Sequence, residues 1–314
     1  MTNDVRKIEN DIVKYYELSI SSVDKITHKT YKINDKNGNS FFIKKTIPNA
    51  LEKYHFLYNQ SCNNILFPIL NNDQKYVTKI NKDSFYLNDF YKTFTIKKEV
   101  NANNMFRELN TLHYNTSFKR QLNPFSTRPK FDEMSNRLDY QFRILEEYVR
   151  NIESRPLEPF SMQILGNYHI ILNAKNEMIK LQKRIISTVK QKEGINYSFI
   201  HNNPKLEHLL NIKGVYYLTS IENGKIGINS LDIAKFYLEN EHLNIDFKSI
   251  LNEHFKNENN QFYYDYFRYL VLLIIIRRIN ITDVDHINSV LFMDATSSIK
   301  RYFENFSDYQ EEVS

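Results

Sequence analysis

The side chains best suited to chemistry lie between Ser198 and Glu239. Two histidines, His201 and His208, stand seven positions apart in this stretch, and imidazole can bind a metal or move a proton near neutral pH. Zinc sites need more ligands than two histidines, and no carboxylate pair lies nearby. The single cysteine, Cys62, excludes a cysteine-based zinc cluster. We therefore predict no metal centre, and we interpret His201 as a hydrogen-bonded core residue.

Short elements must position these residues. The pattern predicts a strand over Ile195–His201, an irregular segment, and a second strand over Val215–Ile221. A turn at Asn223–Gly224 precedes a helix that begins near Ser230, with Asp232 in its first turn. A carboxylate there is stabilised by the positive end of the helix dipole. The sequence thus places the candidate residues on strand ends and turns.

The chain before residue 91 is mostly strand-like. The turn Asn34–Asn39 is rich in Asn and Asp and contains Gly38, which favours a hairpin. One helix is expected over Asn49–Gln60, entered through Pro48. The expected strands are Ser22–Thr27, Thr30–Asn34, Ser40–Thr46, Lys75–Asn81 and Ser84–Asp89. This part is predicted to be a small antiparallel sheet with one helix.

The chain after residue 92 is mostly helical. Apolar residues recur at spacings of three and four from Phe131 to Ile152, the pattern of an amphipathic helix. Further helices are expected around Met105–Leu112, over Ile164–Lys190 and over Phe262–Asn280. The longest apolar run, Tyr269–Ile276, is far shorter than the roughly 18 residues of a membrane-spanning helix. We predict an α+β protein without membrane insertion.

Composition excludes several classes of function. Lys and Arg number 42 against 37 Asp and Glu, and the densest basic segment, Lys180–Lys192, carries apolar residues between its charges. This is typical of the solvated face of a helix, so no nucleic-acid partner is expected. Of the six glycines, only Gly224 and Gly227 lie close together, which excludes a glycine-rich phosphate loop. A single cysteine and a polar start at Met1–Lys14 favour the cytoplasm.

The order of the motifs resembles the catalytic segment of the aminoglycoside phosphotransferase and choline kinase family, particularly its spore-coat CotS-type branch. There the segment runs His-Gly-Asp, His-Pro-x-Asn-Ile-Leu, a hairpin, Ile-Asp-Phe-Glu, and Asp-Leu-Ala opening a helix. The similar stretches here are His201–Asn203, His208–Leu210, Ser220–Glu222 and Asp232–Ala234. The resemblance implies a two-lobed protein-kinase-like fold, with an N-lobe over 1–91 and a helical C-lobe over 92–314 that carries the catalytic segment 198–239.

The resemblance extends to the first part of the chain. Lys44 stands in Phe-Ile-Lys-Lys, similar to the third-strand motif whose lysine holds ATP phosphates, and Glu52 lies where a partner carboxylate is expected. Asp89 stands at the crossing between the lobes, and Leu109–His113 resembles the family's Leu-Ala-x-Leu-His helix. The resemblance therefore implies a nucleotide site of Lys44, Glu52 and Asp89, with ATP as a candidate ligand. From the residues alone, Lys44 and Glu52 also fit solvated surface positions.

The departures from the family pattern concern catalysis. Phosphoryl transfer needs a carboxylate to take the acceptor's proton and oxygen ligands for Mg²⁺. Asn203 stands at the position of the base, and a carboxamide does not accept a proton near neutral pH. His208 and Ser220 stand at the two metal positions, where imidazole suits zinc or copper better and a hydroxyl brings no charge. A missing base alone costs roughly 10² to 10⁴ in rate, and Mg²⁺ is not expected.

Three interpretations remain open. The first, which we favour, is a catalytically degenerate kinase-fold protein that acts on a protein partner by binding or scaffolding. Its similarity to the CotS type implies spore-coat assembly and association with the spore. The second is an active ATP-dependent phosphotransferase in which Glu222 or Glu207 supplies a relocated carboxylate. The third is a helical interaction protein unrelated to kinases. In the first two, the resemblance implies structural roles for His201 and Asp232.

Overall fold

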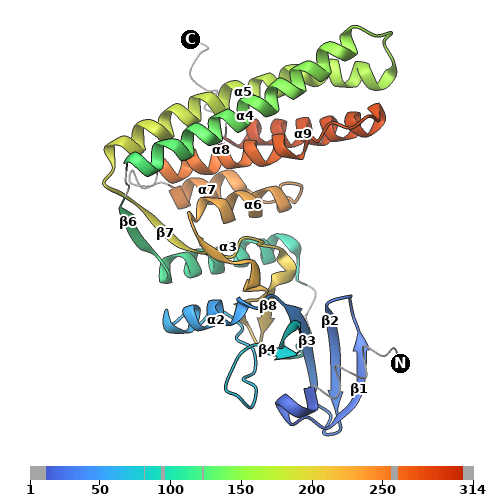
Figure 1. The fold of residues 1–314 in the computed structure, drawn as a ribbon, viewed down its shortest axis with the longest axis vertical. Helices are drawn as coiled ribbons and strands as arrows, with labels where there is room; N and C mark the ends of the chain where they lie inside the picture. The colour runs from blue at the N-terminus through green and yellow to red at the C-terminus, as the bar shows by residue number, and fades with distance from the viewer. Residues whose placement is uncertain (1–11, 81, 93–95, 122–123, 256–260, 307–314) are drawn as a thin grey trace. The chain divides into compact units, whose positions relative to one another are not determined.

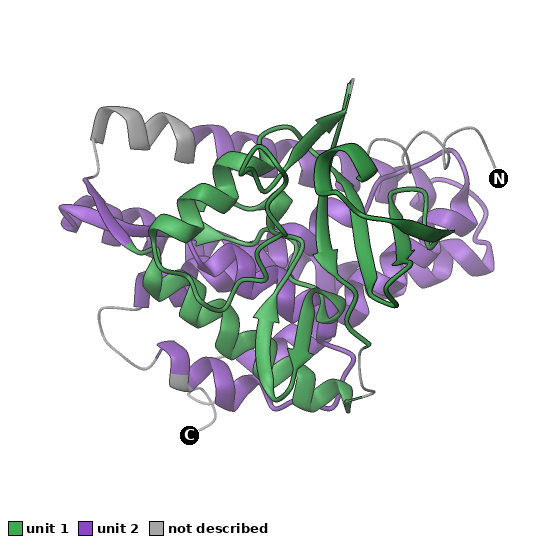
Figure 2. Ribbon diagram, turned by 90° about the horizontal axis from the view of Figure 1, so that it is seen from below, with its two compact units in different colours: residues 1–117, 198–226 green, residues 118–197, 227–314 purple. Residues whose placement is uncertain are grey.

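The computed structural model describes residues 12–80, 82–92, 96–121, 124–255 and 261–306, and only the backbone at 124–131 and 253. It contains a five-stranded sheet, a three-stranded sheet, a two-stranded hairpin and a set of long helices (Figure 1). The chain divides into two compact units, residues 1–117 with 198–226 and residues 118–197 with 227–314 (Figure 2). The α+β class predicted from the sequence is confirmed, whereas the lobe boundary at residue 91 stays a prediction.

The sheet of the first unit is antiparallel, with strand order β1-β2-β3-β5-β4. Asp35 closes the hairpin between β2 and β3, because its Oδ1 accepts hydrogen bonds from the backbone N–H groups of Asn37 and Asn39. Gly38 supplies the left-handed residue of this turn, at φ +86°. The strands are β1 (Ile20–Lys25), β2 (Thr30–Asp35), β3 (Ser40–Thr46), β4 (Thr78–Ile80) and β5 (Asp83–Asp89).

The helix of the first unit, α2 (Ala50–Asn59), buries Ala50, Tyr54 and Leu57. Tyr54 packs at ring-centroid distances of about 6 Å against Phe67, Tyr76 and Tyr86, the last of these from β5. The aromatic residues of the sequence thus fasten the helix to its surroundings through large apolar contacts. The predicted helix is confirmed to within one residue at each end.

The hairpin that carries the candidate residues consists of β8 (Leu209–Ile212) and β9 (Val215–Leu218). It follows a short 3₁₀ turn, η1 (Leu206–His208). Leu218 anchors it, since its N–H donates to the Asn64 carbonyl and its carbonyl accepts from the Leu66 N–H. A long helix, α3 (Lys98–Asn115), also belongs to this unit and buries Met105, Leu109 and Leu112.

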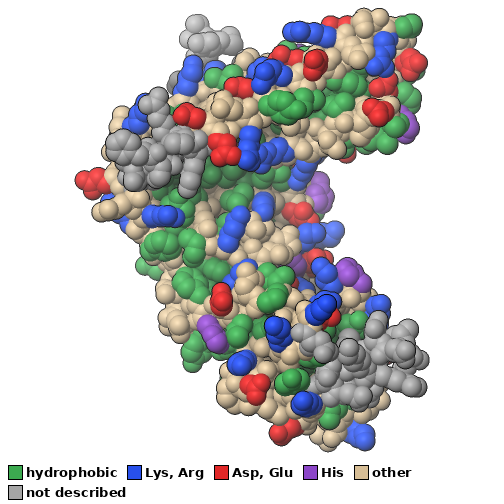
Figure 3. Space-filling view, viewed as in Figure 1, with side chains coloured by type: hydrophobic (Ala, Val, Ile, Leu, Met, Phe, Trp, Pro, Cys, Tyr) green, Lys and Arg blue, Asp and Glu red, His purple; other side chains and the backbone are tan. Residues whose placement is uncertain are grey.

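The second unit is dominated by helices, with α8 at its centre. α8 is buried along most of its length, as its nearly all-round apolar sequence predicts, and packs against α5, α6 and α9. Among the described residues, no helix is long and apolar enough to cross a membrane. Its elements are β6 (Phe118–Gln121), α4 (Pro124–Glu153), α5 (Pro159–Gln191), α6 (Ser230–Asn240), α7 (Phe247–Phe255), α8 (Gln261–Arg278) and α9 (Asp285–Phe306). Strand β7 (Gly194–Ile200) begins in this unit, and its residues from Ser198 on belong to the first unit. On the face shown in Figure 3, basic and acidic side chains are interspersed.

Candidate functional site

Lys44 is the centre of the candidate site. Its ammonium group lies 2.5 Å from Oε1 of Glu222 and donates a hydrogen bond of 2.8 Å to Oγ of Ser220. The side chains of Lys44 and Glu222 are only 17% and 10% exposed. Strand β3 is thereby tied through a nearly buried ion pair to η2 (Ile221–Asn223), the 3₁₀ turn that follows the hairpin.

The backbone at Ser220 brings Glu222 to the lysine. Ser220 has φ 58° and ψ 40°, a left-handed conformation that few residues other than glycine adopt. The strand ends at Leu218, earlier than its predicted end at Ile221, and the Ile221 side chain is buried in the core. Lys53 of α2 then holds the turn, since its ammonium group donates to the Glu222 carbonyl at 2.5 Å.

Two tyrosines extend this cluster into the interior. Tyr86 lies opposite Lys44 in the pairing of β3 with β5, and its hydroxyl is hydrogen-bonded to Ser220 and to Tyr54. Burial raises the pKa of both tyrosines well above the ordinary range, and the charge of Glu222 adds to the effect. Neither tyrosine carries a sequence signal for the site, because Tyr54 belongs to the apolar face of the predicted helix. Their neutral hydroxyl groups continue the hydrogen-bond network of Lys44 and Ser220 into the interior.

The second oxygen of Glu222 is unsatisfied. Oε2 is buried and has no hydrogen-bond partner among the described residues, although Oε1 is paired with Lys44. A buried acceptor without a donor costs roughly 1–3 kcal/mol. The site therefore keeps one acceptor position that a water, a cation or a ligand N–H could fill.

His201 is buried and hydrogen-bonded through both ring nitrogens, and its predicted structural role stays a prediction. It is fully buried, its Nε2 donates to the Thr219 carbonyl at 2.8 Å, and its Nδ1 accepts from the Asn203 N–H at 3.3 Å. Both ring nitrogens are engaged by backbone groups, so this ring cannot bind a metal. The ring instead fixes the loop 201–203 against the end of the hairpin.

His208 is held beside His201 in its neutral form. Its Nδ1 donates to the Asn203 carbonyl at 2.9 Å, and the two rings are stacked with centroids 5.4 Å apart. Burial, followed by the neighbouring His201, lowers the pKa of His208 to about 4. No group of three or more metal-binding side chains occurs in the part of the chain that the structure describes.

The loop between the histidines keeps its backbone shape without glycine. Asn202, at the position of glycine in the family motif, has φ 63°, and Asn is among the residues most tolerant of the left-handed region. Its side-chain amide donates to the Asn223 carbonyl at 3.1 Å. Asn203 fixes both histidine rings through its main chain, while its half-exposed side chain offers a carboxamide where the resemblance expects a carboxylate.

The remaining predicted residues lie elsewhere. The structure pairs Lys44 with Glu222 and not with Glu52, which is exposed and lines a separate hollow of about 290 Å³ with Lys53 and Phe199. The expected Lys44–Glu52 pair is therefore wrong: Glu222 reaches the ammonium group from the η2 turn, so this lysine already has its carboxylate. Asp89 is exposed at the end of β5 and accepts a hydrogen bond from the Tyr91 hydroxyl at 3.2 Å.

Asp232 is buried in the first turn of α6, in the second unit. Its predicted role as a brace of the catalytic loop stays a prediction, as do the nucleotide-binding roles of Lys44, Glu52 and Asp89.

The donor set does not fit Mg²⁺. Hard oxygen ligands, mostly carboxylates, are required, but the two metal positions inferred from the resemblance hold a neutral imidazole at His208 and an uncharged hydroxyl at Ser220. The nearby buried carboxylate, Glu222, is engaged by Lys44 through one of its oxygens. A nucleotide phosphate would have to compete with Glu222 for Lys44.

Comparison with known proteins gives a likeness in structure alone. No family model matches the chain, and no curated protein sequence matches it. An aminoglycoside phosphotransferase from Alicyclobacillus acidocaldarius is similar with a TM-score of 0.68 and 12% identity, over 94% of both chains. A spectinomycin phosphotransferase, solved with ADP and spectinomycin, has a TM-score of 0.53 and 13% identity, over 96% of this chain and 98% of the other. A microcompartment-associated aminopropanol kinase has a TM-score of 0.52 and 11% identity, over 95% and 98%.

The chain has the aminoglycoside phosphotransferase fold. This confirms the two-part, kinase-like architecture that the order of the motifs implies. At these identities the likeness concerns the fold, so the chemistry must be argued from the residues of the site.

Proposed function

We propose that this protein is a catalytically degenerate member of the kinase fold that acts by binding and not by phosphoryl transfer. The observation that carries the proposal is the nearly buried pair of Lys44 and Glu222. The lysine that would hold phosphates is already neutralised, and the buried carboxylate beside it is paired with it through Oε1. Both charges are diverted into holding β3 to the η2 turn.

The absence of a proton acceptor supports the same conclusion. A general base works best with a pKa near the working pH. Asn203 has no basic form, and the pKa of His208, lowered to about 4 by burial and by His201, makes its imidazole a weak base. Neither group at these two positions could activate an acceptor hydroxyl efficiently.

Nucleotide remains a candidate ligand, since the similar spectinomycin phosphotransferase was solved with ADP. We propose that ATP, where it binds, does so without Mg²⁺, and that the protein acts on a protein partner. A role in spore-coat assembly follows from the CotS-type resemblance and stays a prediction.

The alternative function is an ATP-dependent phosphotransferase for a small hydroxyl compound. One observation favours it, namely the buried and unsatisfied Oε2 of Glu222, two residues past Ser220. If a nucleotide phosphate took over Lys44, the whole Glu222 carboxylate would be free for a cation.

Thermal unfolding with ATP, in the presence and absence of Mg²⁺, separates the two functions. A ligand at 100 times its dissociation constant stabilises by about 2.7 kcal/mol, a rise of several degrees for a chain of this size. We expect a rise in the wild type that does not need Mg²⁺ and is lost in Lys44→Ala. Lys45→Ala, the neighbouring exposed position, serves as the control.

Each variant is compared with its own unliganded melting temperature, because Lys44→Ala leaves Glu222 without its partner. The double variant Lys44→Ala/Glu222→Gln removes both charges and repeats the test without a buried unpaired carboxylate. A rise that requires Mg²⁺, or turnover of a hydroxyl acceptor abolished by Lys44→Ala, would overturn the proposal in favour of the enzyme.

A further inference from the structure

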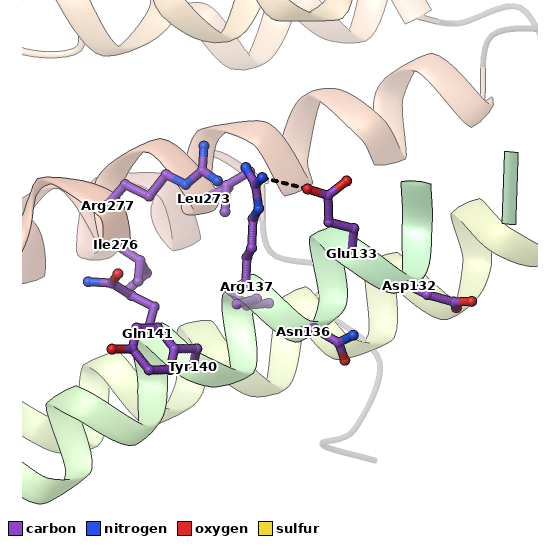
Figure 4. Close-up of a pocket in the computed structure, with 10 residues that line it drawn as sticks. Asp132, Glu133, Asn136, Arg137, Tyr140, Gln141, Leu273, Ile276 and Arg277 are labelled. Atoms are coloured by element: carbon purple, nitrogen blue, oxygen red, sulfur yellow. Dashed lines mark hydrogen bonds and ion pairs between the residues drawn. The ribbon is translucent and has the colours of Figure 1, made fainter. Parts of the chain in front are cut away.

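A hollow of about 690 Å³ lies between α4 and α8, in the second unit (Figure 4). None of the candidate-site residues lines it. Its size falls within the roughly 300–1,000 Å³ of small-molecule sites. It is therefore large enough to hold a ligand of its own, independent of the proposed function.

The floor of the hollow is aliphatic. Leu138 of α4 faces Leu273 and Ile276 of α8, and all three are buried. Gln141 fixes the two walls, since its amide donates to the Ile279 carbonyl just after α8 at 3.2 Å. The apolar surface is thus preformed by helix packing, as it is in small-molecule sites.

The rim carries charge in an uneven arrangement. Arg137 and Arg277 come from different helices, and in Figure 4 their guanidinium groups lie on the same side of the hollow, whereas Asp132 lies toward the opposite end. Arg137 is paired with Glu133 at 2.5 Å. Within the described ranges, no ion pair or hydrogen bond occupies Arg277.

The Arg137–Glu133 pair is easily exchanged. Its side chains are 66% and 60% exposed, and such solvated pairs contribute little to stability. A ligand anion can therefore recruit Arg137 in addition to Arg277.

We propose that this hollow binds a small amphipathic anion, a carboxylate with a short aliphatic body. The carboxylate would meet the fork of donors on Arg277 and Arg137, which matches its two oxygens. The aliphatic body would pack in the hollow against Leu138, Leu273 and Ile276, gaining van der Waals contacts. An anion without a body would not make these contacts, and a neutral chain would leave Arg277 uncompensated.

Titration calorimetry of the full chain with octanoate tests this. We expect octanoate to bind, and Arg277→Gln to weaken it by at least about tenfold, the worth of one charge-assisted hydrogen bond. Arg278→Gln is the matched control, because Arg278 is the next residue, is also exposed and does not line the hollow. Acetate tests the carboxylate alone, and 1-octanol tests the chain alone; both should bind more weakly than octanoate.

Three results would overturn the proposal: no octanoate binding up to millimolar concentration, equal affinity of octanoate and 1-octanol, or equal losses in Arg277→Gln and Arg278→Gln. Arg277 is exposed on a helix, so its replacement should leave the fold intact. Circular dichroism of each variant verifies this. None of these outcomes depends on Lys44 or on nucleotide, so the test stands apart from that of the proposed function.

Discussion

Replacing Glu222 by glutamine isolates the charge of the Lys44–Glu222 pair. The change keeps the size of the side chain and removes only the negative charge. Lys44 would then be a nearly buried cation that donates a hydrogen bond of 2.8 Å to the neutral Ser220 hydroxyl. Removing one partner from a buried pair costs about 3–5 kcal/mol. Because Lys44 keeps 17% exposure and this hydrogen bond, we expect the lower end, about 3 kcal/mol of unfolding free energy.

The adjacent residue on the same strand provides a matched control. Lys45 pairs with Asp83, also at 2.5 Å, but with side chains 43% and 46% exposed. Solvated pairs contribute at most about 1 kcal/mol. Asp83→Asn should therefore lower the free energy of unfolding by about a third as much as Glu222→Gln does. The nitrogen–oxygen distance is the same in the two ion pairs.

The measurement is urea unfolding of wild type, Glu222→Gln, Lys44→Met and the double variant. In a double-mutant cycle, contacting residues show an interaction energy of about 0.5–3 kcal/mol, whereas independent ones add within about 0.5 kcal/mol. We expect about 2 kcal/mol here, since both charges are shielded from solvent.

Two results would refute this reasoning. If Glu222→Gln costs no more than Asp83→Asn, burial does not strengthen the pair. If the effects of Lys44→Met and Glu222→Gln simply add, the two side chains are not partners in solution. The proposal that Lys44 is held by Glu222 and kept from binding phosphate would then fail.

Two further predictions concern the loop and the turns around the site. Burial and the neighbouring His201 lower the pKa of His208 to about 4, so its ring stays neutral in the folded protein. The contribution of His208 to the free energy of unfolding is full above pH 6.5 and falls by about 3 kcal/mol as the pH drops toward 4. His208→Gln should reduce this loss, measured by urea unfolding at pH 7 and 4.5, and an unchanged loss in the variant would contradict the prediction. Gly224→Ala should destabilise by about 1–3 kcal/mol, because the new Cβ would collide with the Phe199 ring. Gly166→Ala, in an open helical position, should stabilise by about 0.5–1 kcal/mol in the same assay; equal effects at both glycines would show that the contact is absent.

The sequence determined the local elements and their order. The hairpin turn at residues 34–39 and the helix Ala50–Asn59 follow from turn chemistry and apolar spacing, which act over a few residues. Boundaries are less accurate where such signals overlap. Of the predicted strand Lys75–Asn81, the described residues 75–80 form a strand over Thr78–Ile80, and Asn81 lies outside the described residues. The helix predicted from Ile164 begins at Pro159, since proline fits the first turn. β6 and α9 were not expected at all; β6 is exposed at all four positions and lacks alternation.

The sequence by itself also determined that Asn203 and Ser220, the residues that the resemblance matches to carboxylate positions, cannot act as carboxylates in any fold. Only the tertiary structure decided what the remaining charges do. Lys44 meets Ser220, 176 positions away, and the carboxylate beside it is Glu222 and not Glu52. No local pattern records this pairing. It depends on the left-handed turn at Ser220 and on the packing of η2 against α2, which bring the buried charges together.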